Sequence, residues 1–394
     1  MEETMSHRSK EEYLRTQSTR YHRAKRDEKS VILDEGSALF GMHRKSLIRA
    51  FGEMRRGPKR RRGRKPRYGP ELLAPLKKIW RLAYQPCGKR LKAMLETWLP
   101  FYEQHHGALE PEIRQGLLAM SASTLDRFLK PIRAKRRKGL CATRSARHIE
   151  GQIPIRTRFQ EVDGPGFFEA DTVAHCGTSM AGRFVWSLTF TDIWSGWTEN
   201  RAVWNRSAAQ IVERIGDIER GLVFDIMSFD SDNGSEFLNW QLVRYFRERA
   251  APVEFTRSRP YRKNDNAHVE QKQWTHVREL LGYDRFEDRR LVRLINDLYR
   301  NEWRALQNFF LPSMRLISKT REGGHLRRRH SAPRTPYARL LDSPKVPQEG
   351  KEQLRREFAG LDPIVLRERI ETKVREILRL ARRQNTRLKT LQAA

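Results

Sequence analysis

The sequence is poor in cysteine and has no long apolar run. Its 394 residues include three cysteines, Cys87, Cys141 and Cys176, too few and too scattered for a disulfide framework or for a zinc site of closely spaced cysteine pairs. No run of about 18 apolar residues could cross a membrane, and the N-terminal MEETMSHRSKEEYLR lacks the apolar centre of a signal peptide. We therefore expect a soluble, intracellular protein with reduced thiols.

Acidic residues are also in short supply. There are 79 Lys and Arg against 48 Asp and Glu, a formal net charge of +31. Residues 1–150 hold 36 basic and 16 acidic residues, a net of +20, which leaves +11 for the longer remainder. An excess of this size indicates a polyanionic partner, and its distribution predicts that nucleic-acid contacts are densest in the first part of a chain long enough for two or three domains.

Residues 1–30 are charged and weakly patterned, whereas SVILDEGSALFGMHRKSLIRAFG (30–52) shows two short helical patterns hinged at Gly41. This resembles a helix-turn-helix whose second helix runs from about His43 to Phe51. We expect its inner face to carry Leu47, Ile48 and Phe51. The residues left to face DNA are Arg44, Lys45 and Arg49. An ordinary helical hairpin with solvated charges is the alternative.

The stretch RRGPKRRRGRKPR (55–67) has nine Lys and Arg residues among Gly and Pro. Such a segment can neither pack nor form a continuous helix. It is typical of an extended arm that follows phosphates or a minor groove, although a nuclear-localisation signal has a similar composition. The predicted DNA contacts of the arm are Arg60, Arg61, Arg62, Arg64 and Lys65.

A second helical region begins near residue 70 and breaks at Pro86-Cys87-Gly88. In MSASTLDRFLKPIR (120–133), Ser121 or Ser123 is expected to cap a short helix with Leu125 and Phe128 on its inner face. Its predicted DNA-facing residues are Thr124, Arg127 and Lys130, as in a second helix-turn-helix. The basic, aperiodic residues that follow, up to 158, are typical of a linker.

The pattern then changes to strands. Three runs rich in aromatic and β-branched residues, within 165–205, are followed by alternating helical and strand patterns. The order β-β-β-α-β-α-β-α is that of a ribonuclease-H-like α/β domain, which predicts a five-stranded mixed sheet with helices.

Three acids fall at distinctive places in this order: Asp171 within the first strand, Asp232 just after the fourth, and Glu270 early in the last helix, 61 and 38 residues apart. If the first and fourth strands are parallel, these carboxylates can converge. Clustered carboxylates suit hard cations such as Mg²⁺ or Mn²⁺, and two such ions about 4 Å apart can process a phosphodiester.

The blocks ADTVAHCG, SDNGSEF and KNDNAHVEQK resemble the three catalytic blocks of the integrase-core (DDE-type) transposases of bacterial insertion sequences, which are relatives of retroviral integrases. The resemblance covers about 160–310. It implies that Asp171, Asp232 and Glu270 are the catalytic, metal-binding triad, that two ions bind per site, and that the protein works in the bacterial cytoplasm, associated with the nucleoid. Gln271 follows Glu270 where many relatives have Arg, and the spacing of the last two acids is slightly long.

Other polar residues near these blocks have more ordinary interpretations. We expect caps, turns or solvated positions for Glu169, Asp192, Asp230, Glu236 and Asp265, with Asp230 the main competitor of Asp232. His175 either contacts a metal-bound phosphate or makes a structural hydrogen bond. Trp194, Trp197 and Trp204 are expected in the core. Basic residues that flank the third acid either hold substrate phosphates or form a solvated loop, and the predicted contacts among them are Arg262, Lys263 and Lys272.

Beyond the catalytic core, residues 313–350 are basic and fit either a β-rich DNA-contacting segment or a connector. The tail shows helical spacing of Leu354, Ile370 and Ile377, for subunit contact or for packing on the same chain. The predicted organisation is therefore a helix-turn-helix (1–54), a basic arm (55–69), a second helical DNA-binding domain (70–132), a linker (133–158), the catalytic core (159–312), a basic segment (313–350) and an amphipathic helix (351–394).

The function that this resemblance implies is that of a DNA transposase, which binds the terminal inverted repeats of its element, cleaves 3′ ends and transfers them to target DNA. Because two ends must be paired, at least a dimer is expected on double-stranded DNA. The alternatives are a nuclease that cuts without joining and a domesticated DNA-binding regulator.

Overall fold

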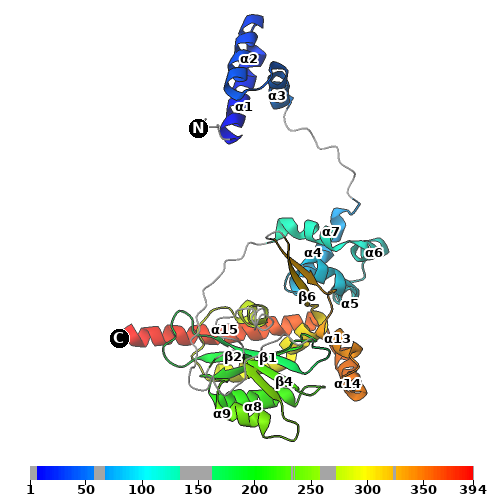
Figure 1. The fold of residues 1–394 in the computed structure, drawn as a ribbon, viewed down its shortest axis with the longest axis vertical. Coiled ribbons are helices and arrows are strands. Elements are labelled where there is room, and N and C mark those ends of the chain that lie inside the picture. Colours follow the sequence, from blue (N-terminus) through cyan, green and yellow to red (C-terminus); the bar gives the residue numbers. More distant parts are fainter. Residues whose placement is uncertain are drawn as a thin grey trace. The chain divides into compact units, whose positions relative to one another are not determined.

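The structure is a computed structural model that describes residues 7–56, 67–133, 162–231, 234, 236–257, 272–322 and 325–393. Figure 1 shows its elements in chain order. The chain divides into two units, Met1–Arg67 and Tyr68–Ala394, which are described separately. Among the described helices, none combines the length and the apolar character needed to span a bilayer.

The first unit contains three helices: α1 (His7–Arg23), α2 (Arg26–Phe40) and α3 (Arg44–Arg56). The hinge at Gly41 is confirmed, because this residue ends α2 with a left-handed φ of 62° that glycine adopts without strain. Leu47 and Phe51 are fully buried, but Ile48 is 44% exposed. The prediction that Ile48 faces the core is wrong.

The cause is α1, which the weak pattern of residues 1–30 did not predict. Ser18 of α1 donates a hydrogen bond from Oγ to the carbonyl of Phe51, at 2.9 Å, so α1 packs on the face of α3 that carries Phe51 and, one turn earlier, Leu47. Ile48 is rotated by about 100° from Leu47 on a helix of 3.6 residues per turn. It therefore falls outside this contact.

The second unit begins with a helical region that comprises η1 (Pro70–Leu72), α4 (Leu73–Leu82), α5 (Gly88–His106), α6 (Pro111–Ala119), α7 (Ala122–Leu129) and η2 (Lys130–Ile132). The break before Gly88 is confirmed, as is the cap at Ser121, whose Oγ accepts a bond from the Thr124 amide at 3.2 Å. This region packs on the rest of the unit: Trp98 donates from Nε1 to the carbonyl of Phe310 at 3.2 Å.

The central sheet consists of β1 (Phe167–Ala174), β2 (Val185–Asp192), β3 (Thr198–Trp204), β4 (Ser228–Ser231) and β5 (Glu254–Arg257), in the order β3-β2-β1-β4-β5. The first three strands are antiparallel, and β1, β4 and β5 are parallel. The five-stranded mixed sheet predicted from the sequence is confirmed. Its strand order and directions are those of a ribonuclease-H-like domain.

The two faces of the sheet differ in chemistry because side chains alternate along each strand. Phe168, Phe190 and Phe229 lie on one face, stacked against each other. Helices α8 (Ala208–Glu219) and α9 (Trp240–Arg247) cover this apolar face, as Figure 1 shows.

The other face, called the polar face below, carries mostly polar side chains: Glu169 and Asp171 of β1, Ser187, Thr189 and Thr191 of β2, Thr198 and Asn200 of β3, Asp230 of β4 and Thr256 of β5. It is covered by a run of helical segments: η4 (Gln273–Arg278), α11 (Glu279–Leu281), α12 (Arg290–Leu298), η5 (Tyr299–Trp303) and η6 (Leu306–Phe310). Of these, η4, η5 and η6 are π-helical turns.

The edge strand β3 is closed by side chains instead of by another strand. The amide of Asn296 bonds both backbone groups of Ala202 at 2.8 and 2.9 Å, and the amide of Asn308 does the same for Thr198 at 2.9 Å each. Between them, Arg201 donates to the carbonyl of Asn200 at 2.8 Å. These contacts remove the unpaired backbone groups that make an open edge prone to pairing with other chains.

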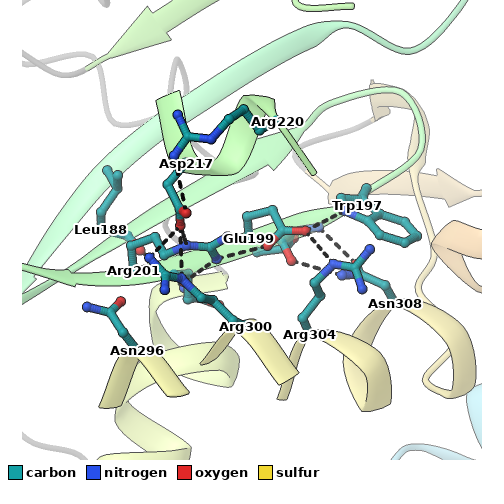
Figure 2. A network of polar contacts seen from close by, with 12 residues as sticks. Leu188, Trp197, Glu199, Arg201, Asp217, Arg220, Asn296, Arg300, Arg304 and Asn308 are labelled. Carbon is teal, nitrogen blue, oxygen red and sulfur yellow. Dashed lines mark hydrogen bonds and ion pairs between the residues drawn. The ribbon is translucent and has the colours of Figure 1, made fainter. Parts of the chain in front are cut away.

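A buried ion network reinforces the same edge (Figure 2). Arg201 donates to Glu199 at 3.0 Å and to Asp217 of α8 at 2.6 Å, and Arg304 donates to Glu199 at 2.9 Å. Arg304 also pairs with Glu357 of α14 (Gln348–Ala359). Charges buried in this way need partners on every side, so the network fixes α8, β3, the helical run and α14 relative to one another.

The C-terminal part contains β6 (Leu316–Glu322), β7 (His325–His330), α13 (Pro336–Asp342), α14 (Gln348–Ala359) and α15 (Pro363–Ala393). Strands occupy only the start of the segment expected to be β-rich. The tail forms two helices where one was expected, because Asp362 caps α15 by accepting from the Ile364 amide at 2.8 Å. Ile370 and Ile377 are buried in the core of their own chain.

Closure of the β3 edge predicts a large effect of removing one asparagine. Asn296→Ala leaves the buried N–H and C=O of Ala202 without partners, and each such loss costs about 1–3 kcal/mol. We expect a decrease of about 2–4 kcal/mol in the free energy of unfolding, measured by urea denaturation. Asn301→Ala, an exposed asparagine five residues later, is the control and should change stability by less than about 0.5 kcal/mol. Equal effects of the two variants would contradict the role given to Asn296.

Candidate active site

Asp171 lies in the middle of β1 on the polar face. Its side chain is half-buried, whereas its neighbours Ala170 and Thr172 are buried. One carboxylate oxygen accepts a hydrogen bond from the Thr172 amide at 2.6 Å, and the other accepts one from Nε2 of Gln273 in η4. Hydrogen bonds from two elements therefore hold the half-buried carboxylate in place.

The other two acids of the predicted triad, Asp232 and Glu270, lie outside the described residues, as do Asp265, Cys141 and seven of the predicted DNA contacts: Arg60, Arg61, Arg62, Arg64, Lys65, Arg262 and Lys263. Two described residues that are near these acids in the sequence are close to Asp171. Ser231, the last residue of β4, pairs with Ala170 across the parallel β1–β4 ladder, and Gln273 contacts Asp171 itself.

The described part of the chain contains no group of three His, Cys, Asp or Glu side chains placed to bind a metal ion. Asp171 is the described member of the predicted oxygen ligands. A half-buried carboxylate on a polar surface has the donor chemistry that a hard divalent cation requires.

Two of the neighbouring acids, Asp192 and Asp230, form hydrogen bonds within the fold. Asp192 caps the start of β1 and the β2–β3 turn by accepting from the amides of Gly166 at 2.9 Å and Ser195 at 2.7 Å, and burial raises its pKa to about 6. Asp230 accepts from Thr256 at 2.7 Å. The expectation of a turn or cap is confirmed for Asp192. Asp230 is instead buried within β4, so the expectation of a cap, a turn or a solvated position is wrong for it.

Glu236 is buried and not solvated, contrary to one of the options expected for it. It accepts from Oγ1 of Thr172 at 2.6 Å and from Arg206 at 3.2 Å. Arg206 in turn lies 4.4 Å above the ring of Trp186. Glu236 thus ties β1, next to Asp171, to the segment that follows β4.

His175 makes a structural hydrogen bond, the second of its two expected roles. Its Nε2 lies 2.8 Å from Oγ of Ser187, which lies 2.8 Å from the hydroxyl of Tyr299, and its ring stacks on Phe286. Complete burial, with a contribution from Arg278, lowers its pKa to about 3. His175 is therefore a neutral link between the polar face and η5.

Gln273 is the residue near Asp171 that the sequence did not predict. It is 102 residues away from Asp171, and an amide side chain carries no signal of chemistry by itself. Its place three positions after Glu270 was the available signal, since residues one helical turn apart lie on one face.

Lys272, predicted as a phosphate contact, donates from Nζ to the carbonyl of Gly196 at 3.4 Å. Burial lowers its pKa to about 7, with further contributions from Arg90 and Arg339. Lys272 therefore contacts the β2–β3 turn, and its role as a phosphate contact stays a prediction.

The predicted DNA contacts on the described helices differ in how exposed they are and in whether they contact other residues of the protein. Arg44 pairs with Asp34 and donates to Ser30 at 2.7 Å, so it is engaged with α2, whereas Lys45 and Arg49 are exposed. Arg127 of α7 and Lys130, the first residue of η2, are exposed, and the hydroxyl of Thr124 lies 2.9 Å from that of Ser121.

The three tryptophans serve packing to different degrees. Trp197 is in the core and donates to Glu199 at 2.9 Å. Trp194 is half-buried beneath Arg315, at 5.3 Å. Trp204 is partly exposed in a groove of about 650 Å³ between α8 and α12, which Asp171 does not line.

Uncharacterized protein y4rM of Sinorhizobium fredii (strain NBRC 101917 / NGR234) is 37% identical over 328 residues, which cover 81% of this chain and 91% of that protein. The chain therefore belongs to the same family as y4rM. No protein-family model matches it.

Among solved structures, the chain is similar to the catalytic core domain of BIV integrase, with 16% identity and a TM-score of 0.28 over 44% of this chain and 93% of that one. It is also similar to the HTLV-2 integrase core in complex with magnesium, with 13% identity and a TM-score of 0.28 over 38% and 90%. The fold assignment rests on the order and directions of the strands.

The buried, neutral state of His175 predicts a specific pH dependence of stability. Because its folded pKa of about 3 is below the ordinary value of 6.5, the unfolded chain binds a proton that the folded chain does not, and stability falls as the pH drops below about 6.5. Between about pH 6.5 and 5, the wild type should lose about 1.5 kcal/mol more than His175→Gln, measured by urea denaturation. The other histidines are shared by both proteins, so their contributions cancel. Parallel pH profiles would show that His175 takes up a proton in the folded state as readily as in the unfolded chain.

Proposed function

We propose that this protein is a metal-dependent DNA transposase of the integrase-core type, which binds the terminal inverted repeats of its element, cleaves 3′ ends and joins them to target DNA. The observation that carries the proposal is Asp171, a half-buried carboxylate at the centre of a strand on the polar face of a ribonuclease-H-like sheet. Carboxylate oxygens are the ligands that hard divalent cations prefer.

Chain connectivity supports a triad of Asp171, Asp232 and Glu270. In the sequence, Asp232 directly follows Ser231, which pairs with Ala170 next to Asp171. Glu270 comes three positions before Gln273, whose side chain contacts Asp171. These sequence neighbours support the assignment of both acids to the site of Asp171.

The three carboxylates would hold Mg²⁺ or Mn²⁺, in keeping with their hard oxygen donors. Two bound ions supply activation of a water or hydroxyl nucleophile and stabilisation of the leaving oxygen. The chain's own residues do the positioning: Gln273 and the Thr172 amide orient the Asp171 carboxylate, and the rigid β1–β4 pair fixes its place.

DNA binding is assigned to the parts of the chain with the largest basic excess. The N-terminal helices α1–α3 and the helical region α4–α7 would contact the terminal repeats, with the arm at 55–67 on phosphates between them. Two paired DNA ends require at least two protomers. The protein would act in the bacterial cytoplasm, on the nucleoid.

A nuclease without joining activity and a DNA-binding regulator remain the competing functions. An assay with a labelled terminal repeat, target DNA and Mg²⁺ separates all three. A transposase yields joined product, a nuclease yields only nicked DNA, and a regulator yields a complex in which the DNA stays intact.

Each acid of the triad should be essential for cleavage and dispensable for binding. Substitution of groups that merely support a metal ligand costs about 10–100-fold, so Asp171→Asn, Asp232→Asn or Glu270→Gln should each reduce cleavage by more than about a hundredfold. Repeat binding, measured by gel shift, should change little. Asp225→Asn, an exposed acid of the same domain, is the matched control. A triad variant that cleaves like the control would be excluded from the triad.

The arm should act through charge alone. Replacing Arg60, Arg61, Arg62, Arg64 and Lys65 with Ala should weaken binding to all duplexes and reduce the slope of log K against log[salt] by up to about 4.5, at about 0.9 per lost phosphate contact. Replacing Arg369 and Arg379, two exposed residues of α15, is the control and should leave the slope unchanged. An unaltered slope in the arm variant would place the arm away from DNA.

A further inference from the structure

The strands β6 and β7 form a two-stranded ribbon that pairs with no other described strand. Every residue of β7 is exposed, as are Leu316, Ile317 and Ser318 of β6. An isolated two-stranded hairpin is marginally stable in water. A ribbon with both faces in solvent therefore indicates a surface that is completed by a partner.

The base of the ribbon, in contrast, is firmly anchored. Ser313 and Arg334 exchange backbone hydrogen bonds at 2.9 and 3.1 Å, and Ser331 donates to the carbonyl of Arg315 at 2.8 Å. Arg315 also donates to the carbonyl of Trp194 in the β2–β3 turn at 2.8 Å, and the buried Arg339 donates to Oγ of Ser313 at 2.8 Å. The ribbon is thus a projection that is fixed to the catalytic unit at one end.

The charge of the ribbon selects the class of partner. The strand β7 reads His325-Leu326-Arg327-Arg328-Arg329-His330, and β6 contributes Arg321. Four exposed guanidinium groups within a few residues complement a polyanion. Duplex DNA fits the shape as well, because its major groove, about 12 Å wide, admits a two-stranded ribbon.

The register of the ribbon divides these residues between two faces with different chemistry. Residues paired across an antiparallel ladder share a face, and faces alternate along each strand. The pairs Ser318–Arg329 and Thr320–Arg327 lie on one face, called the Arg327 face. The pairs Arg321–Leu326 and Leu316–His330 lie on the other, called the Arg328 face because Arg328 shares it.

The Arg327 face has the side chains that read base edges. Arg binds the O6 and N7 acceptors of guanine in the major groove, and Ser or Thr hydroxyls bond to any base. The Arg328 face carries Leu316 and Leu326, which have no hydrogen-bonding group to offer. The two faces therefore differ in their capacity for sequence readout, although each carries two arginines.

We propose that the β6–β7 ribbon enters the major groove of duplex DNA with its Arg327 face toward the base edges, and that it contributes sequence specificity to the enzyme. This deepens the proposed function by assigning a base-reading element next to the catalytic unit and outside the N-terminal helices. It rests on that function only in taking DNA as the ligand.

The test compares two double variants of the full chain that remove the same charge from opposite faces. Arg327→Ala/Arg329→Ala alters the Arg327 face, and Arg321→Ala/Arg328→Ala is the matched control. The probe is a duplex selected from a randomised library by the wild type, compared with its scrambled sequence, in EDTA so that no cleavage occurs. All four residues are exposed. Thermal unfolding is measured as a control that both variants fold.

We expect the Arg327-face variant to reduce the preference for the selected duplex by about tenfold or more, as for loss of one or two base contacts. The control should weaken binding to both duplexes equally and preserve their ratio. Equal loss of preference in both variants, or in neither, would overturn the proposal and leave the ribbon as a phosphate contact or as a surface for another macromolecule.

Modified bases test the groove. Replacing guanine with 7-deazaguanine removes a major-groove acceptor, and replacing it with inosine removes the minor-groove amino group. The wild type should be sensitive to the first change at the contacted positions, and the Arg327-face variant should not. Sensitivity to inosine alone would place the ribbon in the minor groove and contradict the proposal. Because these readouts require no metal, they stand or fall independently of the cleavage results for Asp171→Asn.

Discussion

The polar face of the sheet is the constraint on which the rest of the catalytic unit depends. Ser187, Thr189 and Asn200 lie in the interior, where each unpaired polar group costs about 1–3 kcal/mol. An apolar helix could not cover such a face. The run from η4 to η6 does so with Tyr299, Asn296 and Asn308, which bond side chains or backbone of the strands beneath. The position of this run is therefore set by hydrogen bonds as well as by hydrophobic contact, and the ion network around Glu199 and Arg201 fixes it to α8 and α14 (Figure 2).

This arrangement also explains how a carboxylate is retained at the centre of β1. Asp171 belongs to the polar face, where Glu169 and Thr189 are among its neighbours on the same side, and it is half-buried. Gln273 is both the first residue of η4 and a donor to Asp171. The element that closes the polar face thus also orients the proposed catalytic carboxylate, so errors in closing the sheet would be transmitted directly to the site.

Local pattern predicted the order of the strands and the place of Asp171, because alternation and turn residues are encoded within short windows. It did not predict α1, which has little apolar periodicity and is stabilised by contact with α3. It also placed Ile48 in the core, although Ile48 lies outside the contact between α1 and α3. The asparagines that close β3 were also invisible: Asn296 and Ala202 are 94 residues apart, and an amide looks the same on a surface or against an edge strand. Within the site, Gln273 was missed for the same reason. The assignments of Asp232 and Glu270 stay predictions, derived from motif resemblance.

The arginines show why overall composition is a weak guide to where nucleic acid binds. A net charge of +31 suggests that basic residues bind DNA. Arg201 and Arg304, however, form ion pairs with buried carboxylates. Arg339 is buried and donates to backbone carbonyls at the base of the ribbon. Substitution of these three arginines would therefore act on the stability of the fold and not directly on DNA binding. The arginines of β6 and β7 are different, because they are exposed on a projection whose own pairing does not require them. The basic residues indicate where a partner binds only after those that stabilise the fold have been set aside. On the catalytic unit, the ribbon is a concentrated basic surface among the residues that remain.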